Sequence, residues 1–204
     1  MTGDICTAVY SAPPINKKEI LRYAGAREAD ASLDALLDEC LALVGDGLSY
    51  RVAYAVYPVT KTAEGISLGF FTTSSQDLAK NLDGCHAVIA FGATVGHFID
   101  RMVLREGVRS PAKALLLDAL GTERVEALAD AFCRDLAEKY AKEGCALRPR
   151  FSAGYGDLPL SVQTDVFRAL ALPKSLGVTL SDSLLMTPKK SVTAFVGIVM
   201  KEQV

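Results

Sequence analysis

The sequence predicts an α+β fold in which helices pack around a bent, mostly antiparallel sheet. Apolar and polar residues alternate over Tyr50–Tyr57, as in a half-buried strand. A continuous apolar run over Cys85–Phe91 is typical of a central strand. Strand-like segments come in pairs and helical segments in blocks, which favours antiparallel over parallel pairing. No repeat or linker divides the chain, so we expect one domain over residues 1–204.

Two helices are expected before the first of these strands. Asn16-x-x-Glu19 has the spacing of a reciprocal N-terminal cap, and Gly25 can end the short helix that it begins. Asp30 begins a second helix that Gly45 ends. Its apolar residues recur at helical spacing: Leu33, Leu36, Leu37, Cys40, Leu41 and Val44.

The middle of the chain is expected to continue with strand and helix in turn. Ile66–Phe71 is a candidate partner strand across a loop at Thr60–Gly65, and Ser75–Leu82 suits a short helix that ends at Gly84. A turn at Gly92–Gly96 then leads into an amphipathic helix. That helix carries Phe98, Ile99, Met102 and Val103.

Two further helices are predicted before the last third of the chain. The first begins at Ser110-Pro111, because proline suits the first helical position, and the second begins at Thr122 and runs to Gly144.

The last third is expected to hold a loop, a helix and a hairpin. Residues 151–160 contain turn formers without periodicity, and Ser161 caps a helix through about Leu172. Ser183–Met186 and Val192–Met200 are interpreted as a terminal hairpin.

Composition excludes several classes of function. The 204 residues carry 22 Lys and Arg against 24 Asp and Glu, so the net charge of −2 gives no reason to expect a nucleic acid or an anionic membrane as partner. No apolar run approaches the ~18–20 residues of a membrane span, and the start lacks the pattern of a secretory signal. Five cysteines without close spacing are expected to be reduced thiols, which favours a cytoplasmic protein.

Familiar catalytic motifs are absent from the sequence. There is no phosphate-binding P-loop, and Gly45-x-Gly47 and Gly154-x-Gly156 lack the third glycine of a dinucleotide fingerprint. Two histidines are too few for a His-rich metal cage, so no metal site is expected. His97 can be interpreted as a catalytic base or as a part-buried imidazole, and Cys85-His86 are adjacent residues expected to point to opposite faces of a strand.

The segment Arg148–Pro159 carries the most informative chemistry. An arginine fork such as Arg150 can hold a carboxylate with two charge-assisted hydrogen bonds. Ser152 to Gly156 offers main chain without bulky cover, against which a flat ligand can lie, and Tyr155 adds a ring and a hydroxyl. The alternative is a β-turn with a packed tyrosine.

The motif Arg150-x-x-x-Gly154-Tyr155, with Pro159 four residues on, resembles the reactivation domain of cobalamin-dependent methionine synthase, which binds S-adenosylmethionine. The flanking segments follow in the same order as in that family. They are Gly92–Gly96, Ala129–Phe132, Gly177–Ser183 and Met186–Val192. The resemblance implies an activation-domain-like fold and a function in restoring inactive cobalamin.

The resemblance also assigns roles to single residues. Arg150 would hold the carboxylate of the methionyl group, main-chain atoms at Ser152 and Gly154 would meet the adenine, and Tyr155 would lie near the sulfonium. Asp130 aligns with a helical carboxylate that faces the charged amino-acid end of the ligand. No catalytic side chain is expected, because in this family the reduced cobalt is the nucleophile and the protein supplies proximity.

The sequence departs from the family pattern at several positions. Ala153 replaces a proline and Asp130 replaces a glutamate one methylene longer, while the family has a further tyrosine beyond the point where this sequence ends, at Val204. We therefore expect the affinity for S-adenosylmethionine to be weaker than is usual in the family, or to be lost.

The function implied is that of an accessory protein that supports reductive methylation of cob(II)alamin on a separate corrinoid-binding methionine synthase without its own reactivation domain. A flavodoxin- or ferredoxin-like protein would donate the electron. The partner would supply the cobalamin, because Asp83 and His86 lack the spacing of the cobalt-ligand motif Asp-x-His-x-x-Gly. The alternatives are a non-enzymatic module that binds S-adenosylmethionine or a corrinoid protein, as sensor or chaperone, and an unrelated α+β domain.

Overall fold

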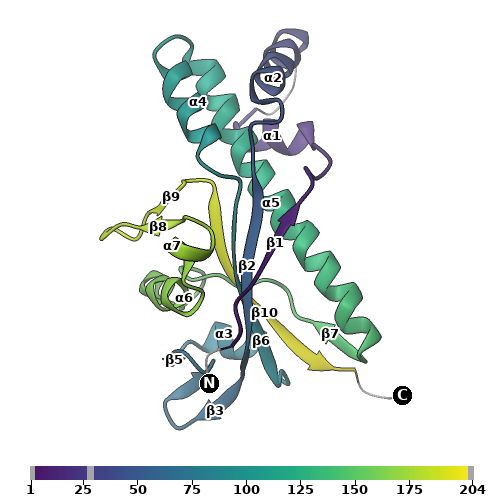
Figure 1. Ribbon diagram of the computed structural model, residues 1–204, viewed down its shortest axis with the longest axis vertical. Helices are drawn as coiled ribbons and strands as arrows, with labels where there is room; N and C mark the ends of the chain where they lie inside the picture. Colours follow the sequence, from purple (N-terminus) through teal and green to yellow (C-terminus); the bar gives the residue numbers. More distant parts are fainter. Residues whose placement is uncertain (1–2, 27–29, 202–204) are drawn as a thin grey trace.

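The computed structural model describes residues 3–26 and 30–201, and it is built on one five-stranded sheet (Figure 1). In spatial order the strands are β1 (Cys6–Tyr10), β2 (Tyr50–Pro58), β6 (Ala87–Thr94), β10 (Ser191–Met200) and β7 (Cys145–Leu147). Every neighbouring pair is antiparallel. The predicted α+β class with an antiparallel sheet is therefore confirmed.

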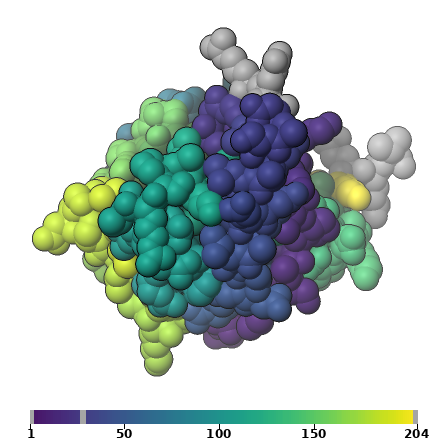
Figure 2. All heavy atoms as spheres, turned by 90° about the horizontal axis from the view of Figure 1, so that it is seen from above, coloured from purple at the N-terminus to yellow at the C-terminus, as the bar shows by residue number. Residues whose placement is uncertain are grey.

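Helices cover both faces of this sheet. The long α5 (Pro111–Lys142) crosses one face, and its N-terminal half packs against α1 (Lys17–Tyr23), α2 (Ala31–Val44) and α4 (Phe98–Gly107). Figure 2 shows α2 and α4 side by side at this end of the molecule. The other face carries α3 (Gln76–Asn81), the 3-10 turn η1 (Leu160–Val162), α6 (Gln163–Ala169) and α7 (Leu172–Ser175). Two small sheets complete the fold: β3 (Thr60–Thr62), β4 (Gly65–Ser67) and β5 (Thr72–Thr73), and β8 (Thr179–Leu180) with β9 (Met186–Thr187).

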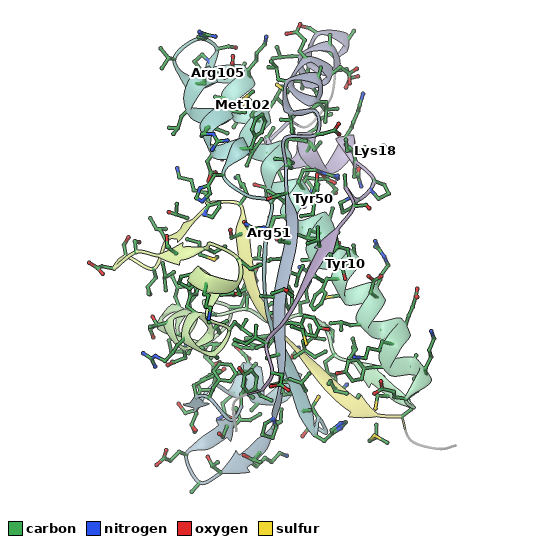
Figure 3. The ribbon with its side chains drawn as sticks, in the orientation of Figure 1. Tyr10, Lys18, Tyr50, Arg51, Met102 and Arg105 are labelled. Carbon is green, nitrogen blue, oxygen red and sulfur yellow. The ribbon has the colours of Figure 1, made fainter. Side chains whose placement is uncertain are left out.

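The central strands contribute side chains to two separate hydrophobic cores, one on each face of the sheet. In β2, Val52 belongs to the core under α5, whereas Ala53 and Ala55 belong to the core under α6. Phe132, in the C-terminal half of α5, packs on Phe91 with ring centroids 5.0 Å apart. Tyr10 of β1 lies between the sheet and α5, edge-on to Phe132 (Figure 3). The sequence correctly predicts β2 as a strand, but the strand is buried on both faces because helices cover both.

One helix replaces the two that were expected over residues 110–144. Ser110 caps α5 as predicted, but α5 then runs without interruption through Thr122. The Thr122 hydroxyl donates to the Asp118 carbonyl one turn earlier, so it stays within the helix instead of capping a new one. A glycine at position 121 suits this helix because there is no room for a Cβ: the aliphatic stem of Lys190 and the side chain of Ile99 occupy that space.

The expected terminal hairpin is wrong. Met186–Thr187 pairs with Thr179–Leu180, whereas β10 pairs with β6 over Ser191–Ile198 and with β7 over Ile198–Met200. Ile66–Phe71 is likewise not a partner of β2, because β4 joins β3 and β5 in a small sheet. The pattern fails here because an apolar strand does not specify which of several equally apolar strands it meets.

Gly92 lies inside β6, where the sequence predicted the start of a turn. A Cβ built there would lie 2.8 Å from Cδ2 of Leu172, which is buried where α7 meets the sheet. We therefore expect Gly92→Ala to lower the free energy of unfolding by about 1–2 kcal/mol, because Leu172 must move in a closed core. Urea denaturation measures the change. Gly107→Ala, which meets nothing within 4 Å, is the matched control and is expected to leave stability unchanged or slightly higher. Equal stabilities of the two variants would contradict this packing.

No helix in the described parts of the chain has both the length and the apolar character needed to cross a bilayer.

Candidate functional site

A cavity of about 500 Å³ lies beside β10, at the point where β7 has ended and the chain turns back through residues 150–155. Its walls come from Glu126 of α5, from the Arg150–Tyr155 loop, from the start of α6 and from residues 191–194 of β10. Leu160 and Met186 add apolar surface. The volume lies within the usual range for a small-molecule site.

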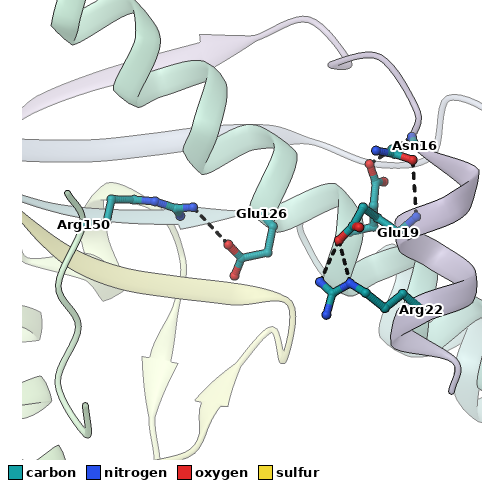
Figure 4. A network of polar contacts seen from close by, with 6 residues as sticks. Asn16, Glu19, Arg22, Glu126 and Arg150 are labelled. Atoms are coloured by element: carbon teal, nitrogen blue, oxygen red, sulfur yellow. Dashed lines mark hydrogen bonds and ion pairs between the residues drawn. The ribbon is translucent and has the colours of Figure 1, made fainter. Parts of the chain in front are cut away.

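Arg150 places a guanidinium in the wall of this cavity. It lies three residues after the end of β7, and Phe151 then bridges to Phe195 of β10, which fixes the direction of the loop. The Arg150 Nη2 atom lies 2.6 Å from Asp130 Oδ1 and 3.2 Å from Glu126 Oε2. Figure 4 shows the arginine reaching across to Glu126 on α5. In the described part of the chain, its Nη1 and Nε atoms make no hydrogen bond. Their three N–H groups stay available to a ligand carboxylate, as separate contacts, because Nη1 and Nε lie on different edges of the guanidinium.

The two carboxylates that meet Arg150 occupy different surroundings. Glu126 lines the cavity, whereas Asp130 lines a neighbouring depression of about 280 Å³ that Glu126 also borders. The Asp130 side chain is 57% exposed and that of Glu126 is 38% exposed. Sequence reasoning named Asp130 and missed Glu126. The available signal was the four-residue spacing, which puts both side chains on one face of a helix.

The loop residues named from the sequence lie at the cavity with different exposures. Ser152 and Tyr155 line it, and the Tyr155 amide donates to the Ser152 carbonyl at 3.2 Å. Gly154 lies behind this surface, and its amide donates to the Leu158 carbonyl at 3.0 Å. With a φ of +87° and Leu160 packed against its α-carbon, Gly154 shapes the turn. Tyr155 is 69% exposed as a residue, so it is not the packed tyrosine of an ordinary β-turn.

The edge of β10 offers a second main-chain surface to the cavity. The main-chain N–H and C=O groups of even-numbered residues point toward β6. The carbonyl of Lys190, just before β10, accepts from the Val95 amide, and the carbonyl of Ile198 accepts from the His86 amide. On the opposite side, Phe195 exchanges two hydrogen bonds with Phe151. Alternation along the strand then directs the N–H and C=O of Thr193 toward the cavity, where they can meet a flat polar ligand.

Asp157 fastens the loop to the rest of the protein. Its carboxylate accepts hydrogen bonds from the Ser75 hydroxyl and from the Gln76 amide at 2.7 Å, at the N-terminus of α3. In return the Asp157 amide donates to Asp77 Oδ2 at 3.2 Å. The sequence predicted the helix after Ser75 but not this reciprocal contact, because nothing local indicates a partner some 80 residues away.

These hydrogen bonds hold the pKa of Asp157 below its usual value, and the bond from Ser75 has the largest effect. A lowered folded-state pKa contributes stability above the unfolded value of about 3.9, and this contribution is lost as pH falls through the folded value. We therefore expect Asp157→Ala to have a lower melting temperature than wild type at pH 7. The difference between the two melting temperatures should be smaller near pH 3. Exposed Asp182, replaced by alanine, serves as the control. A melting temperature equal to that of wild type at pH 7 would contradict the anchoring role.

Other candidate residues lie away from the cavity. His97 is exposed at the start of α4, and burial raises the pKa of the half-buried Cys85 thiol, which keeps it protonated. Within residues 3–26 and 30–201, no three His, Cys, Asp or Glu side chains come together as a metal site would require.

The comparisons with known proteins agree with this geometry at the level of fold. No protein-family model matches the chain, and no curated protein matches it by sequence. Among solved structures, the crystal structure of the MetH reactivation domain bound to AdoHcy matches with a TM-score of 0.69 and 15% sequence identity. The match covers 98% of this chain and 80% of that one. The chain therefore has the fold of that reactivation domain, which confirms the fold expected from the Arg150–Tyr155 motif.

Proposed function

We propose that this chain binds S-adenosylmethionine and supports the reductive methylation of cob(II)alamin on a separate cobalamin-dependent methionine synthase. The observation that carries the proposal is the position of the Arg150–Tyr155 motif. In a chain with the fold of an AdoHcy-bound reactivation domain, this motif lines a cavity of about 500 Å³, and the Nη1 and Nε atoms of its arginine make no hydrogen bond with the described residues. AdoHcy is what remains of S-adenosylmethionine after its methyl group has been transferred.

The donors and acceptors of the cavity suit such a ligand. The charged amino-acid end fits the Arg150 and Glu126 end, where opposite charges lie side by side. The adenine fits between the main chain at Ser152 and the open edge of β10 at Thr193. Apolar surface from Leu160 and Met186 suits the rest of the ligand.

In this proposal the chain holds and orients the ligand and carries out no proton transfer. Arg150 fixes the carboxylate end, and the loop after it fixes the base. Exposed Tyr155 marks the mouth of the cavity, through which the sulfonium methyl group must stay accessible to a docked partner. Cobalamin bound to that partner supplies the metal-centred nucleophile.

Two measurements test the proposal in sequence. Calorimetric titration of the full chain with S-adenosylmethionine and with AdoHcy should give saturable one-to-one binding. The chain is then mixed with a methionine synthase carrying cob(II)alamin, a reduced flavodoxin or ferredoxin and methyl-labelled S-adenosylmethionine, and label is expected on the cobalamin. Absence of binding would refute the ligand assignment. Binding without transfer would refute reactivation and favour a non-enzymatic sensor or chaperone.

A further inference from the structure

Two buried polar side chains in the wall of the cavity have no hydrogen-bond partner. Eight polar or charged residues are buried in the described chain, and six of them make side-chain hydrogen bonds: Ser75, Thr94, Glu106, Glu123, Arg124 and Ser191. The other two, Gln163 (4% exposed) and Thr193 (6% exposed), make none with the described residues, and both line the cavity. Because an unpaired buried polar group costs stability, this arrangement indicates that a ligand completes it.

The Gln163 carboxamide is open to the cavity. Buried side-chain atoms that lack a partner and are also sealed from solvent lie elsewhere in the described chain, at Arg51 Nε and Asn81 Oδ1. The carboxamide of Gln163 is not among these sealed atoms, so a molecule in the cavity can reach it. A carboxamide presents an acceptor oxygen beside a donor NH2 group, so it suits a neutral ligand group with a donor beside an acceptor.

The walls of the cavity come from both faces of the sheet. Glu126 belongs to α5 on one face, and it contacts Arg150. Gln163 is the first residue of α6, which packs on the other face. Side chains alternate along β10, and Phe195 belongs to the core under α6, so the Thr193 side chain lies on the α6 face as well. The charged groups of the cavity thus lie on the α5 side, and the two unpaired neutral groups lie on the α6 side.

Building on the proposed function, which places the adenine between Ser152 and Thr193, we propose that the Gln163 carboxamide recognises the edge of that base. Its oxygen accepts from the 6-amino group of the adenine, and its NH2 group donates to an adjacent ring nitrogen. Glutamine and asparagine form the same pair of hydrogen bonds with adenine in the major groove of DNA. A site that spends a buried amide on the 6-amino group selects against purines that lack it.

The ligand-free protein gives the first test. Gln163→Met keeps the length of the side chain and removes the polar group. Since the carboxamide has no partner to lose, we expect the melting temperature without ligand to equal that of wild type or to rise by up to ~3 °C. Scanning calorimetry measures the shift. A fall of several degrees would show that the carboxamide is bonded within the protein and would overturn the inference.

The second test pairs this variant with a ligand that differs in one group. AdoHcy is compared with its analogue in which purine replaces adenine, so that only the 6-amino group is missing. Affinities are measured by calorimetry, or for weak ligands by displacement of labelled AdoHcy. We expect wild type to prefer AdoHcy about tenfold, and Gln163→Met to bind the two ligands within about twofold of each other. Thr164→Ala, next in sequence but lining a different cavity, is the matched control and should keep the full preference.

The outcomes distinguish failure of this inference from failure of the proposed function. If wild type binds neither S-adenosylmethionine nor AdoHcy, the ligand assignment itself is wrong. If wild type binds AdoHcy without preferring the 6-amino group, or if Gln163→Met keeps the preference, Gln163 does not recognise the base and the inference alone is overturned. A 2′-deoxy analogue of AdoHcy covers the ribose. A loss of affinity for this analogue that is present in wild type and absent in Gln163→Met would assign the carboxamide to the sugar, which also overturns the inference.

Discussion

Replacing Arg150 by alanine is expected to weaken binding of S-adenosylmethionine and AdoHcy by about 2–4 kcal/mol, or roughly 30-fold to nearly 1,000-fold. The loss is large because the guanidinium is the sole cation among the described residues that line the cavity, and its side chain is already 72% buried without ligand. Removing it leaves a ligand carboxylate facing Glu126 with no counter-charge. Calorimetric titration of wild type and variant measures the change.

Two controls make this prediction specific. Arg150→Lys should recover little affinity, because a single ammonium cannot contact Asp130 and also donate to a ligand carboxylate, as the separate Nη2 and Nη1 atoms of arginine can. The ligand-free melting temperature of Arg150→Ala should stay close to that of wild type, since Glu126 and Asp130 are both exposed enough to be hydrated when the arginine is removed. A melting temperature that falls sharply, with affinity unchanged, would make Arg150 structural and reject its role in binding.

The parts of the fold that sequence predicted are those fixed by local chemistry. Asp30 and Gly45 bound α2, and Ser75 caps α3, because caps and left-handed glycines act over a few residues. The Asn16 cap formed only in part: its side chain accepts from the Glu19 amide, but its own amide donates to Glu123 of α5. A contact across more than a hundred residues replaced the local one that the motif favours.

The pairing of strands could not be predicted from the sequence, because it also depends on contacts between distant residues. β1 was not predicted at all, because its five residues are largely exposed and lack a clear alternation, and it gains its place by pairing with β2. At the site, the motif predicted Arg150 and the loop, since a short segment carries both. Glu126, Thr193 and Asp157 became apparent only when the fold brought α5, β10 and α3 to the same loop.

A buried ion pair joins the N-terminal segment to the helix that carries Glu126 and Asp130. Arg124 is 2% exposed, and its Nε and Nη2 atoms donate to the two oxygens of Glu123 at 2.6 Å each. The same guanidinium donates to the carbonyls of Pro13 at 2.6 Å and Pro14 at 2.8 Å. Arg124 thereby holds the chain between β1 and α1 against α5, beside the depression that Asp130 lines.

Arg124→Ala should lower the free energy of unfolding by about 3–5 kcal/mol, because it leaves the Glu123 charge and two carbonyls buried without the guanidinium. Glu123→Ala should cost a similar amount, and the double variant should cost less than the sum of the two, since the second removal deletes a group already without its partner. Urea denaturation of the three variants gives these values. Exposed Arg134 on the same helix, replaced by alanine, is expected to change stability by less than ~0.5 kcal/mol. Because the segment at Pro13 is released, Arg124→Ala should also be cleaved there by a nonspecific protease before wild type is. Additive costs, or an Arg124→Ala variant as stable as Arg134→Ala, would show that the pair does not hold this segment to α5.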